Sequence, residues 1–179
     1  MKKILTLGAS SSKNSINKTF AQYAGSQLKD CECITIDLND FEMPIYSIDR
    51  EEANPIPQLA IQFVEIIESV DGVILSLAEH NGSYTSIFKN IIDWASRHKK
   101  TLWSEKSMLL LSTSPGGRAA SLVMQTAQTS FPHLGAKIVA NFSLPSFYTH
   151  FKEGEITDNK LKSEFKAECQ KFQTSLKSQ

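Results

Sequence analysis

The fold is decided by residues 71–97, which read DGVILSLAEHNGSYTSIFKNIIDWASR. The segment 70–77 is apolar on both faces, as expected of a parallel strand that helices cover on both sides. Residues 83–97 then repeat apolar positions at helical spacing, so a helix follows the strand. The turn between them is polar and contains a glycine. A strand that leads through a short turn into a helix is the repeating unit of an open α/β sheet.

The same alternation continues along the whole chain. We expect strands over 3–7, 34–38, 70–77, 107–112 and 137–141, and helices over 15–28, from Pro57 onward, and over 83–97, 118–134 and 159–176. Five such strands predict a doubly wound parallel sheet with helices on both faces, in the flavodoxin-like order 2-1-3-4-5. Because no repeat or linker interrupts the pattern, residues 1–179 are predicted to form a single domain.

Composition excludes several classes of protein. Nineteen basic and nineteen acidic residues balance, whereas a nucleic-acid partner would require a basic excess or stripe. No apolar run approaches the roughly 18 residues of a membrane span, and the apolar part of MKKILTLG is too short for a signal peptide. The three cysteines have no metal-ligand spacing and are expected to be reduced thiols. We therefore expect a cytoplasmic protein without a metal site or a membrane or nucleic-acid partner.

The first predicted strand ends in a loop that is rich in hydroxyl groups, GASSSKNSIN at residues 8–17. A phosphate at this helix start would meet unpaired backbone N–H groups and the positive end of the helix dipole. Neither a Walker A motif nor Gly-x-Gly-x-x-Gly is present, which favours a monophosphate over a pyrophosphate. The alternative is a helix cap by Ser15 or Asn14 with no ligand. The candidate phosphate ligands are Ser10, Ser12, Lys13, Ser15, Ile16 and Asn17.

Two further loops follow the third and fourth predicted strands. Asn81, Gly82 and Ser83 can present backbone groups to the edge of a planar ring, with Gly82 allowing close approach or a positive φ. Glu79 is a candidate acid or base and His80 a candidate aromatic plate or proton donor, although a solvated loop carboxylate and a surface histidine are the commoner cases.

The segment Ser114-Pro115-Gly116-Gly117 forms a tight turn beyond the fourth strand. It can direct N–H dipoles at a ring that becomes anionic on reduction, or it can be a simple connector. Because the three loops share the carboxyl edge of one sheet, where ligands bind in such folds, they point to a flavin site. Three residues are candidates for substrate contact: Tyr84, Arg118 and Trp103.

Taken together, the three loops resemble those of the NADPH-dependent FMN reductase family, which includes quinone, chromate and azo-dye reductases. The resemblance covers residues 2–145 in the same order of motifs. Lys13 stands where that family has an arginine, Ala78 where it has a proline, and His80 where it has a tyrosine. The other matching positions are Ser10, Ser15, Asn17, Glu79, Asn81, Gly82, Ser83, Lys89, Asn90, Asp93, Trp94 and residues 114–117.

The resemblance implies an enzyme with FMN as cofactor and NADPH or NADH as co-substrate. A small acceptor, such as a quinone or free flavin, would then be reduced by a ping-pong mechanism. No catalytic side chain is required, because the flavin N5 takes the hydride. Relatives form homodimers or homotetramers through the helices after the third and fourth strands. The alternatives are a flavodoxin-like electron carrier and a flavin-free binding module without NAD(P)H turnover.

Overall fold

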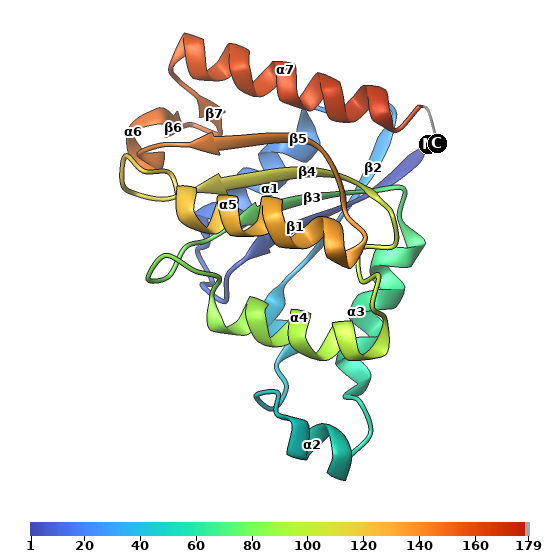
Figure 1. Cartoon of the computed structure of the whole chain (residues 1–179). Coiled ribbons are helices and arrows are strands. Elements are labelled where there is room, and N and C mark those ends of the chain that lie inside the picture. Colours follow the sequence, from blue (N-terminus) through green and yellow to red (C-terminus); the bar gives the residue numbers. More distant parts are fainter. Residues whose placement is uncertain (178–179) are drawn as a thin grey trace.

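The computed structural model describes residues 1–177. In this part of the chain, five parallel strands form one sheet in the order β2-β1-β3-β4-β5 (Figure 1). The strands are β1 (Lys2–Ala9), β2 (Cys31–Ile36), β3 (Gly72–Leu77), β4 (Ser107–Thr113) and β5 (Lys137–Leu144). This arrangement confirms the predicted flavodoxin-like sheet and its strand order.

Helices cover both faces of the sheet. On one face lie α1 (Ile16–Ser26) and α7 (Asn159–Ser175), and on the other lie α3 (Gln58–Ser69), α4 (Ser86–His98) and α5 (Ser121–Ser130). Along β3, Val73 and Leu75 join the core under α3, α4 and α5, whereas Ile74 joins the core under α1 and α7. The central strand is therefore buried on both faces, as its apolar run predicted.

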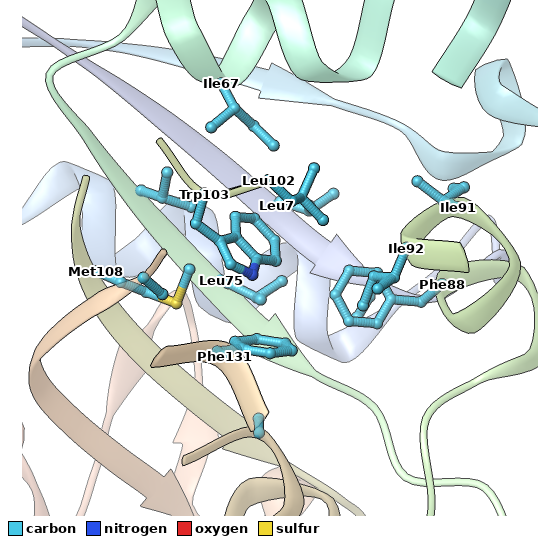
Figure 2. Close-up of a cluster of buried hydrophobic side chains, with 14 of the residues drawn as sticks. Leu7, Ile67, Leu75, Phe88, Ile91, Ile92, Leu102, Trp103, Met108 and Phe131 are labelled. Carbon is cyan, nitrogen blue, oxygen red and sulfur yellow. The ribbon is translucent and has the colours of Figure 1, made fainter. Parts of the chain in front are cut away.

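Trp103 lies within the core under α3 and α4 (Figure 2). Its side chain is fully buried, and its ring centroid lies 5.1 Å from that of Phe131 and 6.4 Å from that of Phe63. The Trp103 backbone N–H donates to the Leu134 carbonyl. The prediction that Trp103 contacts a substrate is wrong, because this large indole is packed into the core just before β4, at the opposite end of that strand from the predicted site.

Two predicted helices differ from their expected bounds by three residues or more at an end. Helix α4 begins at Ser86, three residues later than predicted, because the Thr85 hydroxyl accepts the Phe88 N–H and caps the helix. Helix α5 is shorter than the predicted 118–134, and a 3-10 helix, η2 (Phe131–Leu134), follows it. Pro132 has no N–H to donate, which ends the regular helix there.

Several short elements were not predicted. They are η1 (Leu38–Phe41), α2 (Ile48–Ala53), α6 (Phe147–His150) and the hairpin of β6 (Phe151–Lys152) and β7 (Glu155–Ile156). Helix α2 projects from the body of the protein, and α6 lies beyond the carboxyl end of β5 (Figure 1). Within residues 1–177, no helix has both the length and the apolar character needed to cross a bilayer.

Candidate functional site

The loops after β1, β3 and β4 meet around one cleft at the carboxyl edge of the sheet. The cleft has a volume of about 200 Å³. It is lined by Ser10, Ser12, Asn14, Ser15, Ile16, Asn17, Ala78, Glu79, His80, Thr113, Ser114, Pro115 and Tyr148. A larger hollow of about 640 Å³ lies between α7 and the segment 27–30. We place the site in the smaller cleft, because open α/β sheets bind ligands beyond the carboxyl ends of their strands.

The first loop is held tightly against the start of α1. A Cβ on Gly8 would lie 2.4 Å from the backbone nitrogen of Lys18, so only glycine allows the loop to approach the helix this closely. The Ser15 hydroxyl accepts the Lys18 N–H, which confirms Ser15 as the helix cap. The N–H groups of Ile16 and Asn17, in the first helical turn, have no intrahelical acceptor. These donors and the helix dipole fit an anionic group in the cleft.

The Asn17 side chain is used inside the protein. Its Oδ1 accepts hydrogen bonds from the Ser76 hydroxyl and the Thr113 N–H, and its Nδ2 donates to the Thr113 carbonyl. The side chain is 3% exposed. The amide therefore joins α1 to β3 and β4, and the contact of Asn17 with the phosphate stays a prediction.

Charged side chains near the first loop are either paired or exposed. The Lys18 ammonium lies 2.6 Å from the Asp37 carboxylate, and this hydrogen bond lowers the pKa of Asp37. Lys13 is exposed, and within residues 1–177 it forms no ion pair; it does not line the cleft. The anion-binding character of the cleft therefore depends mainly on backbone N–H groups and hydroxyls.

The second loop forms a two-residue hairpin turn. The backbones of His80 and Ser83 exchange two hydrogen bonds of 3.0 Å, with Asn81 at φ 52° and Gly82 at φ 76° between them. The predicted positive φ of Gly82 is confirmed. His80 faces the cleft, whereas Asn81, Gly82 and Ser83 lie outside its lining.

Glu79 caps a helix from another loop. Its Oε2 accepts the N–H groups of Leu122 and Val123, both at 3.0 Å, in the first turn of α5. The residue at the α5 N-cap position, Ala120, is left-handed and offers no side-chain acceptor. Glu79 therefore connects the second loop to the helix that follows the third loop.

The third loop is open to solvent and anchored from β5. The Gly116 carbonyl accepts the Ser146 N–H, and the Ser114 carbonyl accepts the Phe147 N–H. Gly116 and Gly117 are exposed, and a Cβ on Gly117 would meet nothing within 4 Å. The turn therefore leaves room for a ligand beside its backbone, although neither glycine lines the cleft itself.

Of the two remaining predicted substrate residues, Tyr84 is packed against the protein and Arg118 is exposed. The Tyr84 hydroxyl hydrogen-bonds the Ser130 hydroxyl, and its ring stacks on Phe131; burial raises the pKa of this phenol. Arg118 is exposed in the turn before α5 and does not line the cleft. Tyr84 is therefore used inside the protein, whereas the contact of Arg118 with a substrate stays a prediction.

The helix motif that follows the second loop serves the fold. Asn90 donates to the carbonyls of Met43 and Pro44, and the Trp94 indole also donates to Pro44. Lys89 and Asp93 form an exposed ion pair one turn apart. Asn90 and Trp94 hold the segment 43–46 against α4, and none of these four side chains is in the cleft lining.

Four lining residues were not among the predicted ligands: Asn14, Ala78, Thr113 and Tyr148. The first three adjoin predicted positions along the chain and could have been included on that ground. Tyr148 comes from α6, a four-residue helix after β5. No local pattern indicated that this segment turns back toward the first loop.

Residues 2–149 match the protein family described as NADPH-dependent FMN reductase. The chain belongs to this family. It is therefore an oxidoreductase of the NAD(P)H-dependent FMN reductase and quinone reductase type, with FMN as cofactor and NAD(P)H as electron donor. The free N–H groups and hydroxyls at the α1 start are the donor set that a flavin monophosphate requires.

Individual relatives cover nearly the whole chain. A 2-hydroxy-1,4-benzoquinone reductase of Burkholderia sp is 26% identical over 159 residues, which are 88% of this chain and 83% of that protein. FerB, a flavoenzyme NAD(P)H:(acceptor) oxidoreductase from Paracoccus denitrificans, gives a TM-score of 0.77 at 24% identity over 99% of this chain and 98% of its own. An NADH:FMN oxidoreductase (EMOB) in its apo form gives a TM-score of 0.75 at 19% identity, and the match covers 100% of this chain and 92% of that chain. These two structures support the fold.

Proposed function

We propose that this protein binds FMN in the cleft between its three loops and passes hydride from NAD(P)H to a quinone, a free flavin or a similar small acceptor. The observation that carries the proposal is the convergence of the α1 N-terminus with the loops after β3 and β4 on one cleft. In this arrangement Ser10, Ser12, Ser15 and the backbone of 16–17 would hold the phosphate.

The second and third loops would hold the ring. When bound, FMN supplies the hydride-accepting chemistry, so the chain needs no acid–base pair of its own. The backbones of Asn81 and Gly82 and of Gly116 and Gly117 would direct N–H groups at the ring and stabilise negative charge on it. His80, exposed at the cleft, would cover part of one ring face.

The first test is a flavin absorbance titration. We expect the purified protein to retain FMN after desalting, and anaerobic NADPH or NADH to bleach the flavin bands. The donor that bleaches faster identifies the preference. Retained colour that neither nucleotide bleaches would replace the reductase by an electron carrier. Failure to bind FMN at any concentration would overturn the proposal in favour of a flavin-free binding module.

The order of the reaction is tested by steady-state kinetics. Because one exposed ring face would serve both the nicotinamide and the acceptor, the two substrates should bind in turn and give a ping-pong mechanism. Double-reciprocal plots at several concentrations of benzoquinone should then be parallel. Intersecting lines would show that both substrates bind together, which contradicts a shared face.

We further propose that the protein is a homodimer or homotetramer. The large apolar residues of α4, Phe88, Ile91 and Trp94, are buried within the single chain. They are therefore not available to form an interface between subunits. Exposed apolar side chains instead occur at the projecting α2 segment, where Ile45 is 75% and Ile48 57% exposed. Light scattering after size exclusion should give a multiple of 19.9 kDa. A mass of one chain would exclude this assembly.

A further inference from the structure

Tyr148 is held at the cleft by backbone bonds to the third loop. The Ser146 N–H donates to the Gly116 carbonyl and the Phe147 N–H to the Ser114 carbonyl. These two bonds fix the start of α6 beside the third loop. The Phe147 ring packs edge-on against Tyr148, with 5.6 Å between centroids. Tyr148 lines the cleft even though it is 65% exposed. Its position is therefore set by the fold, while its side chain remains accessible.

Aromatic packing places α6 beside α1, the helix whose start forms the anion site. The ring of Phe147 stacks on that of Phe151, with 4.8 Å between their centroids. The centroid of Phe151 lies 6.4 Å from that of Phe20 and 5.1 Å from that of Tyr23, both on α1. The cleft lining accordingly joins Tyr148 to Ser12, Asn14, Ser15 and Ile16 of the first loop and helix start. Tyr148 thus shares this small cleft of about 200 Å³ with the candidate phosphate-binding groups.

The Tyr148 hydroxyl is available for a ligand. Within the described residues 1–177 it has no hydrogen-bond partner, whereas Tyr46 donates to Glu51 and Tyr84 pairs with Ser130. A phenol can donate one hydrogen bond to a phosphate oxygen. A donor from this side would complement the N–H groups of α1, which approach the same anion along the helix axis.

We propose that the Tyr148 hydroxyl donates a hydrogen bond to the phosphate of bound FMN and makes the cleft selective for FMN over riboflavin. This inference depends on the proposed flavin site and adds to it a ligand from α6. The bond connects the β5 end of the sheet to the phosphate, so four segments rather than three enclose the cofactor. Because the acceptor is charged, the bond contributes more than a neutral pair.

The test compares two ligands that differ only in the phosphate. Dissociation constants of FMN and riboflavin are measured by flavin fluorescence for the wild-type protein and for Tyr148→Phe. Loss of one charge-assisted hydrogen bond should weaken FMN binding roughly tenfold. Riboflavin affinity should stay unchanged, because it has no phosphate to accept the bond. Tyr46→Phe is the matched control, since it removes a phenol hydroxyl whose partner is Glu51.

The outcomes separate this inference from the flavin proposal itself. If wild-type protein binds FMN and Tyr148→Phe binds it equally well, the phosphate contact is refuted and the flavin site stands. An equal loss for FMN and riboflavin would also refute it, because the hydroxyl would then contact the part common to both. Absence of FMN binding by the wild type would overturn the proposed function and this inference with it. Tyr148→Phe keeps the ring, so its contact with Phe147 and its folding should be preserved.

Discussion

Replacing Glu79 by alanine should destabilise the protein although the residue lies on a surface loop. The change removes the acceptor of two N–H groups, of Leu122 and Val123, at the start of α5. Loss of a helix cap costs about 1 kcal/mol, and loss of a carboxylate at the positive helix end adds roughly 0.3–1 kcal/mol. The Val123 N–H is partly buried and poorly replaced by water, so we expect a total near 2 kcal/mol, about the upper end of capping effects.

Glutamine should recover part of this loss. Glu79→Gln keeps an oxygen that can accept the same N–H groups but removes the charge, so it should cost only about 0.5–1 kcal/mol. The matched control is Glu65→Ala on α3, since Glu65 is exposed and, within residues 1–177, has no ion pair or side-chain hydrogen bond. Its effect should stay within about 0.5 kcal/mol.

Urea unfolding of the flavin-free protein measures all three variants without involving the cofactor. For a chain of this length, about 2 kcal/mol corresponds to a fall in Tm of roughly 4–8 °C. FMN affinity should decrease in parallel, because the second loop and α5 lose their connection. The reasoning is refuted if Glu79→Ala unfolds at the same urea concentration as Glu65→Ala, or if Glu79→Gln is as unstable as Glu79→Ala.

Three other changes test separate contacts. Lys18 lowers the pKa of Asp37 in the folded protein. The ion pair therefore stabilises the folded state at a pH above the unfolded carboxyl pKa near 4, and this stabilisation is lost as the pH falls through the pKa of the folded state. Asp37→Asn should lower the free energy of unfolding by about 0.5 kcal/mol at pH 7 and by less at pH 3, as measured by urea unfolding. Burial raises the pKa of the Cys169 thiol to about 12. Ellman's reagent should therefore react with exposed Cys33 in the native protein and with Cys169 only after denaturation. Rapid labelling of Cys169 in the native protein would contradict its burial. Gly8→Ala places a methyl group 2.4 Å from the Lys18 nitrogen and should lower the free energy of unfolding by about 1–3 kcal/mol, whereas unchanged urea unfolding would mean that α1 does not pack so closely.

Local patterns were sufficient where structure depends on neighbours in the chain. The apolar run 70–77 predicted β3, Ser15 was one of two predicted caps of α1, and a positive φ was one of two predicted roles of Gly82. In each case the determining interactions lie within a few residues. The positions of the three loops followed as well, because parallel strands place their carboxyl ends at one edge.

Interactions between distant segments were not predictable in this way. Glu79 caps the N-terminus of α5 by accepting the N–H of Leu122, 43 residues further along the chain. An N-cap residue normally directly precedes the helix that it caps. Trp103 lies in a largely polar segment, from which we predicted a substrate contact, yet its ring enters the core against Phe63 and Phe131. Asn17 was predicted as a ligand because an amide can donate, and the sequence did not indicate that its side chain also bonds to Ser76 and Thr113.

These long-range bonds also bear on how the cleft binds a cofactor. Asn17 joins the first loop to the end of β4, the Thr85 hydroxyl joins the second to the Ala9 carbonyl, and Glu79 joins the second to α5. The Ser146 N–H fixes the third loop from β5. Ordering a loop on binding reduces affinity, so a cleft whose loops are already connected to one another should lose little in this way. If FMN binds there as proposed, backbone N–H groups that the fold keeps in place would supply most of its contacts, and the cleft would need few charged side chains to bind the phosphate.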